Sequence, residues 1–250
     1  MAARTDHDER AEADAGAETA APKRRGASRL AMAVSILGEL LITAGLVLGL
    51  FVVYSLWWTN VVADRKADKQ GDKVRDNWAQ DKGGPGALDT KDGIGFLHVP
   101  SMKNGEVLVE KGTSTKVLND GVAGYYIDPV KATLPMTDKT GNFTLAAHRD
   151  GHGAKFHNID KIKKGDPIVF ETKDDWYVYK VFSILPETSK YNVKVLQSVP
   201  KQSGRTKPGH FITLTTCTPV YTSEYRYIVW GELERVQKVD SARTPPKELG

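Results

Sequence analysis

The chain has 250 residues, of which 40% are hydrophobic and 26% charged, which suffices for one globular domain with a real core and appendages. Its 35 basic and 31 acidic side chains are interspersed along most of the sequence and leave a formal net charge of +4. No continuous basic face therefore predicts nucleic-acid binding. A single cysteine, Cys217, excludes an intramolecular disulfide, so its thiol either packs in a core or takes part in chemistry.

The N-terminal region divides by composition into two parts. Residues 1–29 lack the apolar content needed for ordering, so we predict a disordered cytoplasmic tail. Residues 30–58 are almost wholly apolar with one acid, Glu39, and exceed the roughly 20 residues that a spanning helix needs. Because this run is longer than the apolar part of a signal peptide and ends in Trp57-Trp58, we predict an uncleaved transmembrane signal anchor.

Basic residues flank the predicted anchor on both sides and set its orientation only weakly. Before it stand Lys23, Arg24, Arg25 and Arg29, and after it stand Arg65, Lys66, Lys69 and Lys73. The first cluster is dense and close to the apolar run, and a domain that follows a first anchor is commonly translocated whatever its charge. We therefore expect a single-pass membrane protein with a cytoplasmic N-terminus and an extracellular folded domain.

The next segment, residues 59–90, is a charged stalk or linker by its composition. Acidic and basic residues alternate along 61–82 with few large apolar residues, which favours a solvated helix with local ion pairs. The run Gly83-Gly84-Pro85-Gly86 then ends any helix. We place the folded domain at 91–238 and a C-terminal tail at 239–250.

The folded domain is predicted to be all-β. Short segments rich in Val, Ile, Phe, Tyr and Thr alternate with Gly, Pro, Asn and Asp turns, whereas a parallel α/β fold would need long helices between strands. Only two short helical pieces, 115–121 and 156–162, are expected, so a barrel or sandwich is favoured. The predicted strands are 95–99, 107–110, 143–147, 167–171, 176–185, 210–215 and 225–236.

Cys217 follows the β-branched run 211–216 and precedes Thr218-Pro219, where the proline ends a regular ladder. We therefore expect the thiol at the end of a strand, where a rigid backbone opens towards a cleft. The alternative is a buried cysteine that packs as a small hydrophobe, which is the commoner fate of a lone cysteine.

His148 ends another β-like run, 143–147, and the turn signal Arg149-Asp150-Gly151 follows it. With an unperturbed pKa of about 6.5, a histidine beside a thiol can give a proton to a leaving amine. Taken alone, such a histidine is more often structural.

Arg226 lies nine positions after Cys217 in a further strand-like segment, so a hairpin would set the two side by side. A guanidinium suits the stabilisation of negative charge on a tetrahedral oxygen, although an exposed arginine in an ion pair is the simpler reading. Together, the cysteine, the histidine and the arginine describe an acyl-transfer site at strand ends.

Two segments carry a resemblance to a known family. Residues 213–217 read TLTTC, which matches the TLXTC signature of the sortases, and Arg226 stands where that family places its essential arginine. Residues 143–149 resemble the family's catalytic-histidine segment, usually alanine-glycine-histidine-arginine, with Ala147 as a departure that concerns packing more than proton transfer. The resemblance covers roughly residues 94–236.

The resemblance implies a closed eight-stranded β-barrel with Cys217 as nucleophile, His148 as proton donor and Arg226 as oxyanion stabiliser. Sortases recognise a C-terminal sorting signal on a secreted protein and cleave it between threonine and glycine. They then pass the acyl group to a cell-wall amine, usually on a lipid-linked peptidoglycan precursor. We expect the same class of substrate and acceptor here.

A finer resemblance concerns the subclass. The N-terminal anchor and the segments Gly124-Tyr125-Tyr126 and Thr133-Leu134-Pro135 resemble class E sortases of high-GC Gram-positive bacteria, which prefer LAXTG over LPXTG signals. The resemblance assigns Tyr126 to the second residue of the signal, and we also assign Thr215 and Thr216 to substrate binding. Tyr126 could equally be a core residue whose hydroxyl is satisfied.

We expect no metal and no other cofactor. The pair Asp174-Asp175 has too few acidic neighbours for calcium. Competing hypotheses are a zinc site built on His148, His152 and His157, a non-catalytic extracellular binding module, and a sortase-like hydrolase. The long connection 187–209 is expected to form a wall of the substrate pocket.

Overall fold

The computed structural model describes residues 28–80 and 93–250. These residues divide between Leu48 and Gly49 into two compact units. The basic cluster at 23–25 and the predicted break at 83–86 lie outside the described residues.

The predicted anchor is helical. Helix α1 spans Arg29–Val53, contains no buried residue and leads into the single π-helical segment η1, Tyr54–Trp58. This part of the chain is long and apolar enough to cross a membrane. The finding fits the single-pass anchor that the hydropathy of 30–58 predicts.

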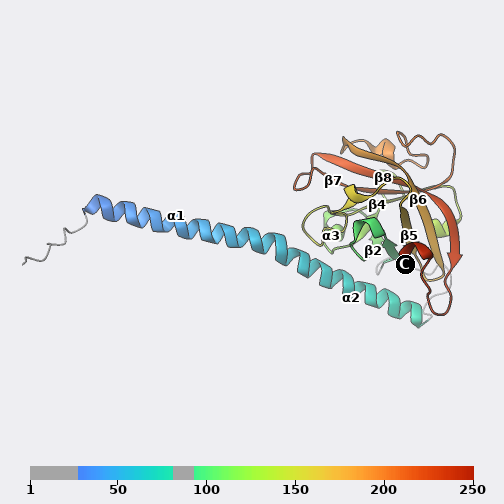
Figure 1. The fold of residues 1–250 in the computed structure, drawn as a ribbon, viewed down its shortest axis with the longest axis horizontal. Coiled ribbons are helices and arrows are strands. Elements are labelled where there is room, and N and C mark those ends of the chain that lie inside the picture. Colours follow the sequence, from blue (N-terminus) through green and yellow to red (C-terminus); the bar gives the residue numbers. More distant parts are fainter. Residues whose placement is uncertain (1–27, 81–92) are drawn as a thin grey trace, which may run out of the picture. The chain divides into compact units, whose positions relative to one another are not determined.

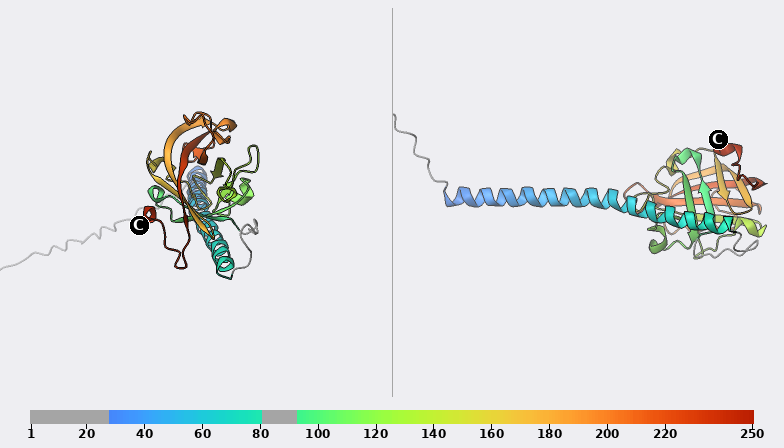
Figure 2. Two further views of the ribbon diagram at one scale, coloured as in Figure 1. Left: turned by 90° about the vertical axis from the view of Figure 1, so that its right-hand side faces the viewer. Right: turned by 90° about the horizontal axis from the view of Figure 1, so that it is seen from below.

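Helix α2, Thr59–Ala79, corrects the prediction of a solvated stalk. The segment is helical as predicted, but it belongs to the same unit as the barrel and lies along the outside of the barrel wall (Figure 2). Its face of small side chains is buried, and part of it packs with Phe96 and Leu108. The alternating charges concealed this stripe, which consists of Ala63, Ala67, Gly71 and Val74.

Eight strands close into a barrel in the order β1-β2-β3-β4-β7-β8-β6-β5, with β5 returning to β1. Figure 1 labels several of them. The predicted closed eight-stranded barrel is therefore confirmed. The strands are β1 Gly95–His98, β2 Glu106–Lys111, β3 Ala123–Tyr125, β4 Gly141–Ala146, β5 Pro167–Glu171, β6 Asp175–Ser189, β7 His210–Thr218 and β8 Tyr225–Lys238.

Seven of these strands follow the predicted segments, and β3 was missed because three residues give no periodic signal. The pairs β2/β3 and β4/β7 are parallel, and the other pairs are antiparallel. The long pair β6/β8 carries three register shifts, which bend these strands around the barrel. The parallel pair β4/β7 matters most for function, because both strands end at the same edge.

The interior of the barrel is apolar and tightly filled. Phe143, Phe170 and Leu214 are among the fully buried side chains of its core. The two expected helical pieces appear as a helix α3, Thr115–Leu118, and a short 3-10 turn η4, Ile159–Lys161. The remaining 3-10 turns are η2 Pro100–Met102, η3 Pro135–Thr137, η5 Val193–Leu196 and η6 Lys247–Leu249.

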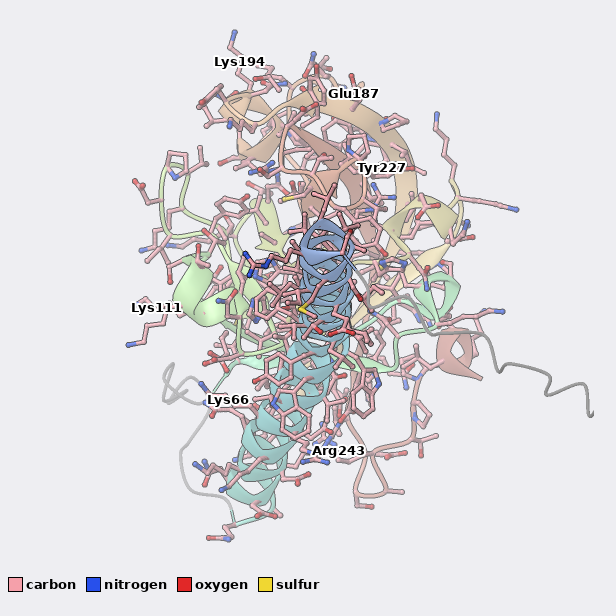
Figure 3. All side chains as sticks on the ribbon, turned by 90° about the vertical axis from the view of Figure 1, so that its left-hand side faces the viewer. Lys66, Lys111, Glu187, Lys194, Tyr227 and Arg243 are labelled. Carbon is pink, nitrogen blue, oxygen red and sulfur yellow. The ribbon has the colours of Figure 1, made fainter. Side chains whose placement is uncertain are left out.

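The predicted C-terminal tail also packs onto the barrel. Val239 and Leu249 contact the apolar cluster around Trp176, and Arg235 pairs with Glu248. In Figure 3, Arg243 of this tail lies near α2, whereas Glu187 and Lys194 lie at the opposite end of the barrel. Both segments that flank the predicted domain are thus part of its packing.

Candidate active site

The parallel pair β4/β7 brings the histidine segment to the cysteine strand. Ala146, the last residue of β4, pairs with Thr215, and the Ala147 amide donates to the Thr215 carbonyl at 3.4 Å. His148 follows directly and thus reaches the Cys217 end of β7. Two residues that lie 69 positions apart in the sequence are set at one edge of the barrel by this register.

Cys217 and Arg226 are cross-strand partners in the antiparallel pair β7/β8, which confirms the predicted hairpin. The Cys217 thiol is free and half-buried rather than enclosed in the core, which is unlike the packing role considered for it. The Arg226 guanidinium donates to the carbonyls of Tyr225 at 2.9 Å and Ser223 at 3.2 Å. Among the described residues it has no carboxylate partner, so its charge remains available to an anion beside the thiol.

The His148 imidazole is half-buried and held by a neighbour that the sequence did not reveal. Its Nε2 lies 2.8 Å from Oδ1 of Asn119, at the end of α3. Because an amide oxygen only accepts, Nε2 carries hydrogen and Nδ1 is the nitrogen that can exchange a proton. Burial lowers the pKa of His148, the charge of His152 lowers it further, and Asp150 opposes both. The neutral imidazole is therefore favoured at pH 7.

Asn119 could not be found from the sequence. It follows a four-residue helix and reads as an ordinary helix C-terminus. Only the closure of β3 onto β4 brings this turn next to His148.

Tyr126 lies in the same neighbourhood. Burial raises the pKa of its phenol, the charge of Arg226 lowers it, Cys217 raises it, and a hydrogen bond with Thr215 lowers it. Its ring packs against a small apolar cluster that contains Val195, Leu196, Ile228 and Trp230. The structure thus brings Tyr126 beside both Cys217 and Arg226.

The threonines of the signature are buried. Thr216 donates from its hydroxyl to the Ala147 carbonyl at 2.7 Å, which ties the cysteine strand to the residue before His148. Thr215 is 2% exposed. The assignment of Thr215 and Thr216 to substrate binding stays a prediction. The hydrogen bond of Thr216 to Ala147 helps to position the cysteine strand against the histidine segment.

Arg149 is the arginine of the histidine segment, and the sequence did not predict its contacts. Its buried guanidinium donates to the Thr218 hydroxyl at 2.8 Å and to Asp160 at 3.2 Å, and it faces the Tyr227 ring. It therefore joins the segment after His148 to the segment after Cys217.

The three histidines of the zinc hypothesis do not converge on one point. His148 and His152 have ring centroids 5.5 Å apart, but His157 bonds through Nδ1 to the Arg149 carbonyl. The described residues bring together a different group with ligand atoms, His98, Glu106 and Glu171.

This group forms part of what we call the Glu171 cluster, namely Arg75, His98, Glu106, Glu171 and Arg243. Glu171 contacts Arg75 at 3.1 Å, His98 at 2.9 Å and Arg243 at 2.7 Å. Two guanidinium groups thus already neutralise the carboxylate, and they would repel a metal cation. The donor set fits an ion-pair network and not a metal site.

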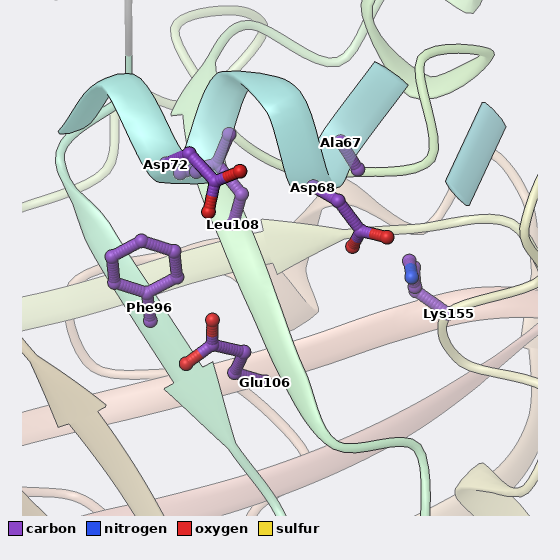
Figure 4. A pocket seen from close by; sticks show the side chains of 8 residues that line it. Ala67, Asp68, Asp72, Phe96, Glu106, Leu108 and Lys155 are labelled. Carbon is purple, nitrogen blue, oxygen red and sulfur yellow. The ribbon is translucent and has the colours of Figure 1, made fainter. Parts of the chain in front are cut away.

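A cavity of about 230 Å³ lies between α2 and strands β1 and β2 (Figure 4). Its lining includes Phe96, Leu108, Glu106 and Lys155, but none of Cys217, His148 or Arg226. The chemistry at the strand ends is therefore separate from this cavity.

Comparisons with known proteins agree with this geometry. A family model described as a sortase domain matches residues 97–234. The chain is 71% identical to sortase SrtE2 of Streptomyces coelicolor over 255 residues, which covers 100% of both chains.

Solved structures show the same fold. A crystal structure of sortase E1 from Streptomyces coelicolor with a tripeptide in the active site is 47% identical, with a TM-score of 0.59, and covers 63% of this chain and 96% of that one. Sortase E from Streptomyces avermitilis is 29% identical, with a TM-score of 0.55, and covers 63% of this chain and 97% of that one.

The fold and these likenesses define an enzyme, a β-barrel cysteine transpeptidase. Its single cysteine at a strand end is consistent with that class. The chain belongs to the sortase family.

Proposed function

We propose that this protein is a class E sortase that cleaves a C-terminal LAXTG-type or LPXTG-type sorting signal between threonine and glycine. It then transfers the acyl group to an amine of a cell-wall precursor. The observation that carries the proposal is the cross-strand pair of Cys217 with Arg226, with His148 at the same edge of the barrel. Nucleophile, oxyanion donor and acid are then supplied by three adjacent strand ends.

In the first step, the Cys217 thiolate attacks the threonine carbonyl carbon. The oxygen becomes negatively charged, and the Arg226 guanidinium stabilises it by donating N–H groups. The C–N bond then breaks, and the leaving glycine amine takes the proton from Nδ1 of the His148 imidazolium. This leaves a thioester on Cys217 and a neutral imidazole.

In the second step, the acceptor amine attacks the thioester carbonyl. The neutral His148 takes the proton of the incoming amine, the C–S bond breaks, and the thiolate is regenerated. Since burial lowers the pKa of His148, the neutral base is well populated at pH 7, whereas the imidazolium that the first step needs is a minor form. A small fraction of thiolate and imidazolium suffices, because a cysteine thiolate is strongly nucleophilic.

Recognition of the signal involves the β6/β7 connection and Tyr126. Strand β6 runs to Ser189, further than predicted, and the turn η5 after it packs Val195 and Leu196 against the cluster that includes Tyr126. The Trp230 indole donates to the Val195 carbonyl at 3.1 Å, which fixes the connection to β8. A wall held this close to Tyr126 suits an extended peptide that reaches Cys217. The tripeptide bound by the 47% identical sortase E1 supports a peptide substrate.

The protein is anchored by the helix within 30–58, with its N-terminus in the cytoplasm and the catalytic unit outside. This orientation presents Cys217 to secreted proteins and to cell-wall precursors. It rests on the charge distribution around the anchor and on the fold of the domain that follows.

The test uses the full chain in detergent micelles, because α2 belongs to the catalytic unit. Matched LAXTG and LPXTG peptides are incubated with and without a glycine amine, and Cys217→Ala serves as the control. We expect cysteine-dependent transfer that favours LAXTG. Cleavage without transfer would identify a hydrolase instead, and the absence of cleavage by an alkylatable Cys217 would overturn the proposal.

A further inference from the structure

Helix α2 contacts both of the segments that hold the His148 ring. We propose that α2 is a positioning element of the active site, which sets the imidazole through Asn60 and Asp64 on one side and Lys66 on the other. This inference deepens the proposed function and rests on the role given there to His148.

The first set of contacts is made with the turn that follows His148. Asn60 Oδ1 accepts a hydrogen bond from the Gly153 amide at 2.8 Å. Asp64 pairs with Lys155 at 2.9 Å, and only 13% of the Lys155 side chain is exposed. His152, whose ring lies 5.5 Å from the His148 ring, sits in this turn. The first two turns of α2 therefore fix the segment that carries one neighbour of the imidazole.

The turn is shaped for this approach. Gly153 has a φ of +82°, and a Cβ there would lie 2.9 Å from Oδ1 of Asp64. A side chain at this position would strain the backbone and displace the Asp64 carboxylate. The contact thus depends on a residue without a side chain.

The second set of contacts is made with the turn that follows α3. Asn119, the hydrogen-bond partner of His148, is followed by Asp120, which forms an ion pair with Lys66. Gly121 packs on the α2 backbone so closely that a Cβ would lie 2.8 Å from the Ala63 carbonyl oxygen. The partner of Nε2 is therefore also held by α2.

The middle of α2 is held by packing, since Ala67 and Gly71 are buried there beside a cavity. The cavity in Figure 4 separates Asp68 and Asp72 of α2 from Glu106 of β2. Further along, Arg75 joins the Glu171 cluster. Two of its attachment regions, one at the segments around His148 and one at Glu171, are therefore far enough apart along the helix to be tested separately.

The experiment compares variants of the full chain in detergent micelles. Asn60→Leu removes the acceptor for the Gly153 amide, and Asn60→Asp retains an acceptor oxygen. We expect Asn60→Leu to lower kcat about 10-fold with KM within about 2-fold, because His148 is misplaced while the proposed peptide-binding wall near Tyr126 is unchanged. Asn60→Asp should recover most of the rate.

A second readout does not depend on turnover. The pKa of His148, followed by NMR of labelled histidine, should rise towards about 6.5 in Asn60→Leu. The imidazole is then less firmly held and more exposed to solvent, and exposure removes the effect of burial that lowers this pKa. Asp150 and His152 act on this pKa in every variant, and His148→Gln assigns the signal.

Arg75→Met is the matched control, since it loosens α2 at the Glu171 end only. It should lower the unfolding temperature and leave the His148 pKa and kcat unchanged. The inference is overturned if Asn60→Leu behaves as wild type, or if Arg75→Met changes kcat and the His148 pKa as much as Asn60→Leu does. A wild type without cysteine-dependent transfer would instead overturn the proposed function, while the pKa comparison still reports on positioning.

Discussion

Two polar regions of this barrel differ in how their charges are compensated. In the Glu171 cluster, one buried carboxylate is contacted by Arg75, His98 and Arg243. At the strand ends around Cys217, the partners of the Arg226 guanidinium within residues 28–80 and 93–250 are two backbone carbonyls of its own hairpin. In the first region, the charge of Glu171 is neutralised by side chains of the protein. In the second region, the charge of Arg226 remains available to bind an anion beside the Cys217 thiol.

This difference separates a structural network from a reactive site. Burial raises the pKa of Glu171, but hydrogen bonds with His98, Arg75 and Arg243 outweigh it and bring the pKa to about 2. The carboxylate therefore stays ionised and holds α2 and the C-terminal segment together. At the other region, burial lowers the pKa of His148 and favours the neutral imidazole, which suits proton exchange.

The largest effect is expected for His148→Gln. The amide keeps a donor near Asn119 but cannot exchange a proton, so kcat/KM should fall about 10³-fold. Peptide cleavage measures the loss, and alkylation of Cys217 should persist. His210→Gln, on the same strand as the cysteine, is the control, and a similar loss there would remove the special role of His148.

Arg226→Lys should lower kcat about 100-fold, since the charge is kept and the fork of donors is lost. Single-turnover formation of the thioester is the measurement. Arg235→Lys, further along β8 and paired with Glu248, should retain its rate. A fully active Arg226→Lys would show that the guanidinium geometry is not needed.

Glu171→Gln should destabilise the fold and leave chemistry unchanged. The pKa of Glu171 falls from 4.5 to about 2 on folding, so its ion pairs contribute about 3 kcal/mol above pH 4.5. This contribution is lost as the pH falls through about 2, because the folded pKa is the lower one. Thermal unfolding measured between pH 7 and about 2 is the test. The unfolding temperatures of wild type and Glu171→Gln should differ at pH 7 and become equal as the pH approaches about 2.

The exposed Glu187 provides the control for this pH series. Glu187→Gln should unfold as wild type does at every pH, because this carboxylate lies on the exposed part of β6. An equal loss of stability in both variants would show that net charge, and not the Glu171 cluster, is responsible.

The smallest effect is expected for Tyr126→Phe. The variant loses a hydroxyl that forms a hydrogen bond with Thr215 near Cys217. Its kcat/KM for LAXTG peptides should fall about 5-fold, which narrows the preference for LAXTG over LPXTG peptides. Tyr125→Phe, in the barrel core, should leave the preference intact. If both variants behave alike, Tyr126 is a packing residue.

The sequence by itself predicted the reactive residue types and determined most of the strands. The TLTTC segment, the arginine nine residues later and the β-branched runs are local signals, because strand formation and hairpin pairing depend on neighbouring residues. The apolar run 30–58 is equally local, since its length and composition define it.

Only the tertiary structure decided what surrounds the reactive groups. Asn119 has no sequence signature, and Arg149 belongs to the histidine segment but its partners do not follow from the sequence, because barrel closure brings distant turns together. Helix α2 looked solvated because its charged residues outnumber the small residues of its contact face. A stripe of alanine and glycine nevertheless lets the helix pack closely on the barrel, and this packing is visible only in the tertiary structure. Local patterns specify elements and reactive residue types, whereas the partners of those residues depend on long-range contacts.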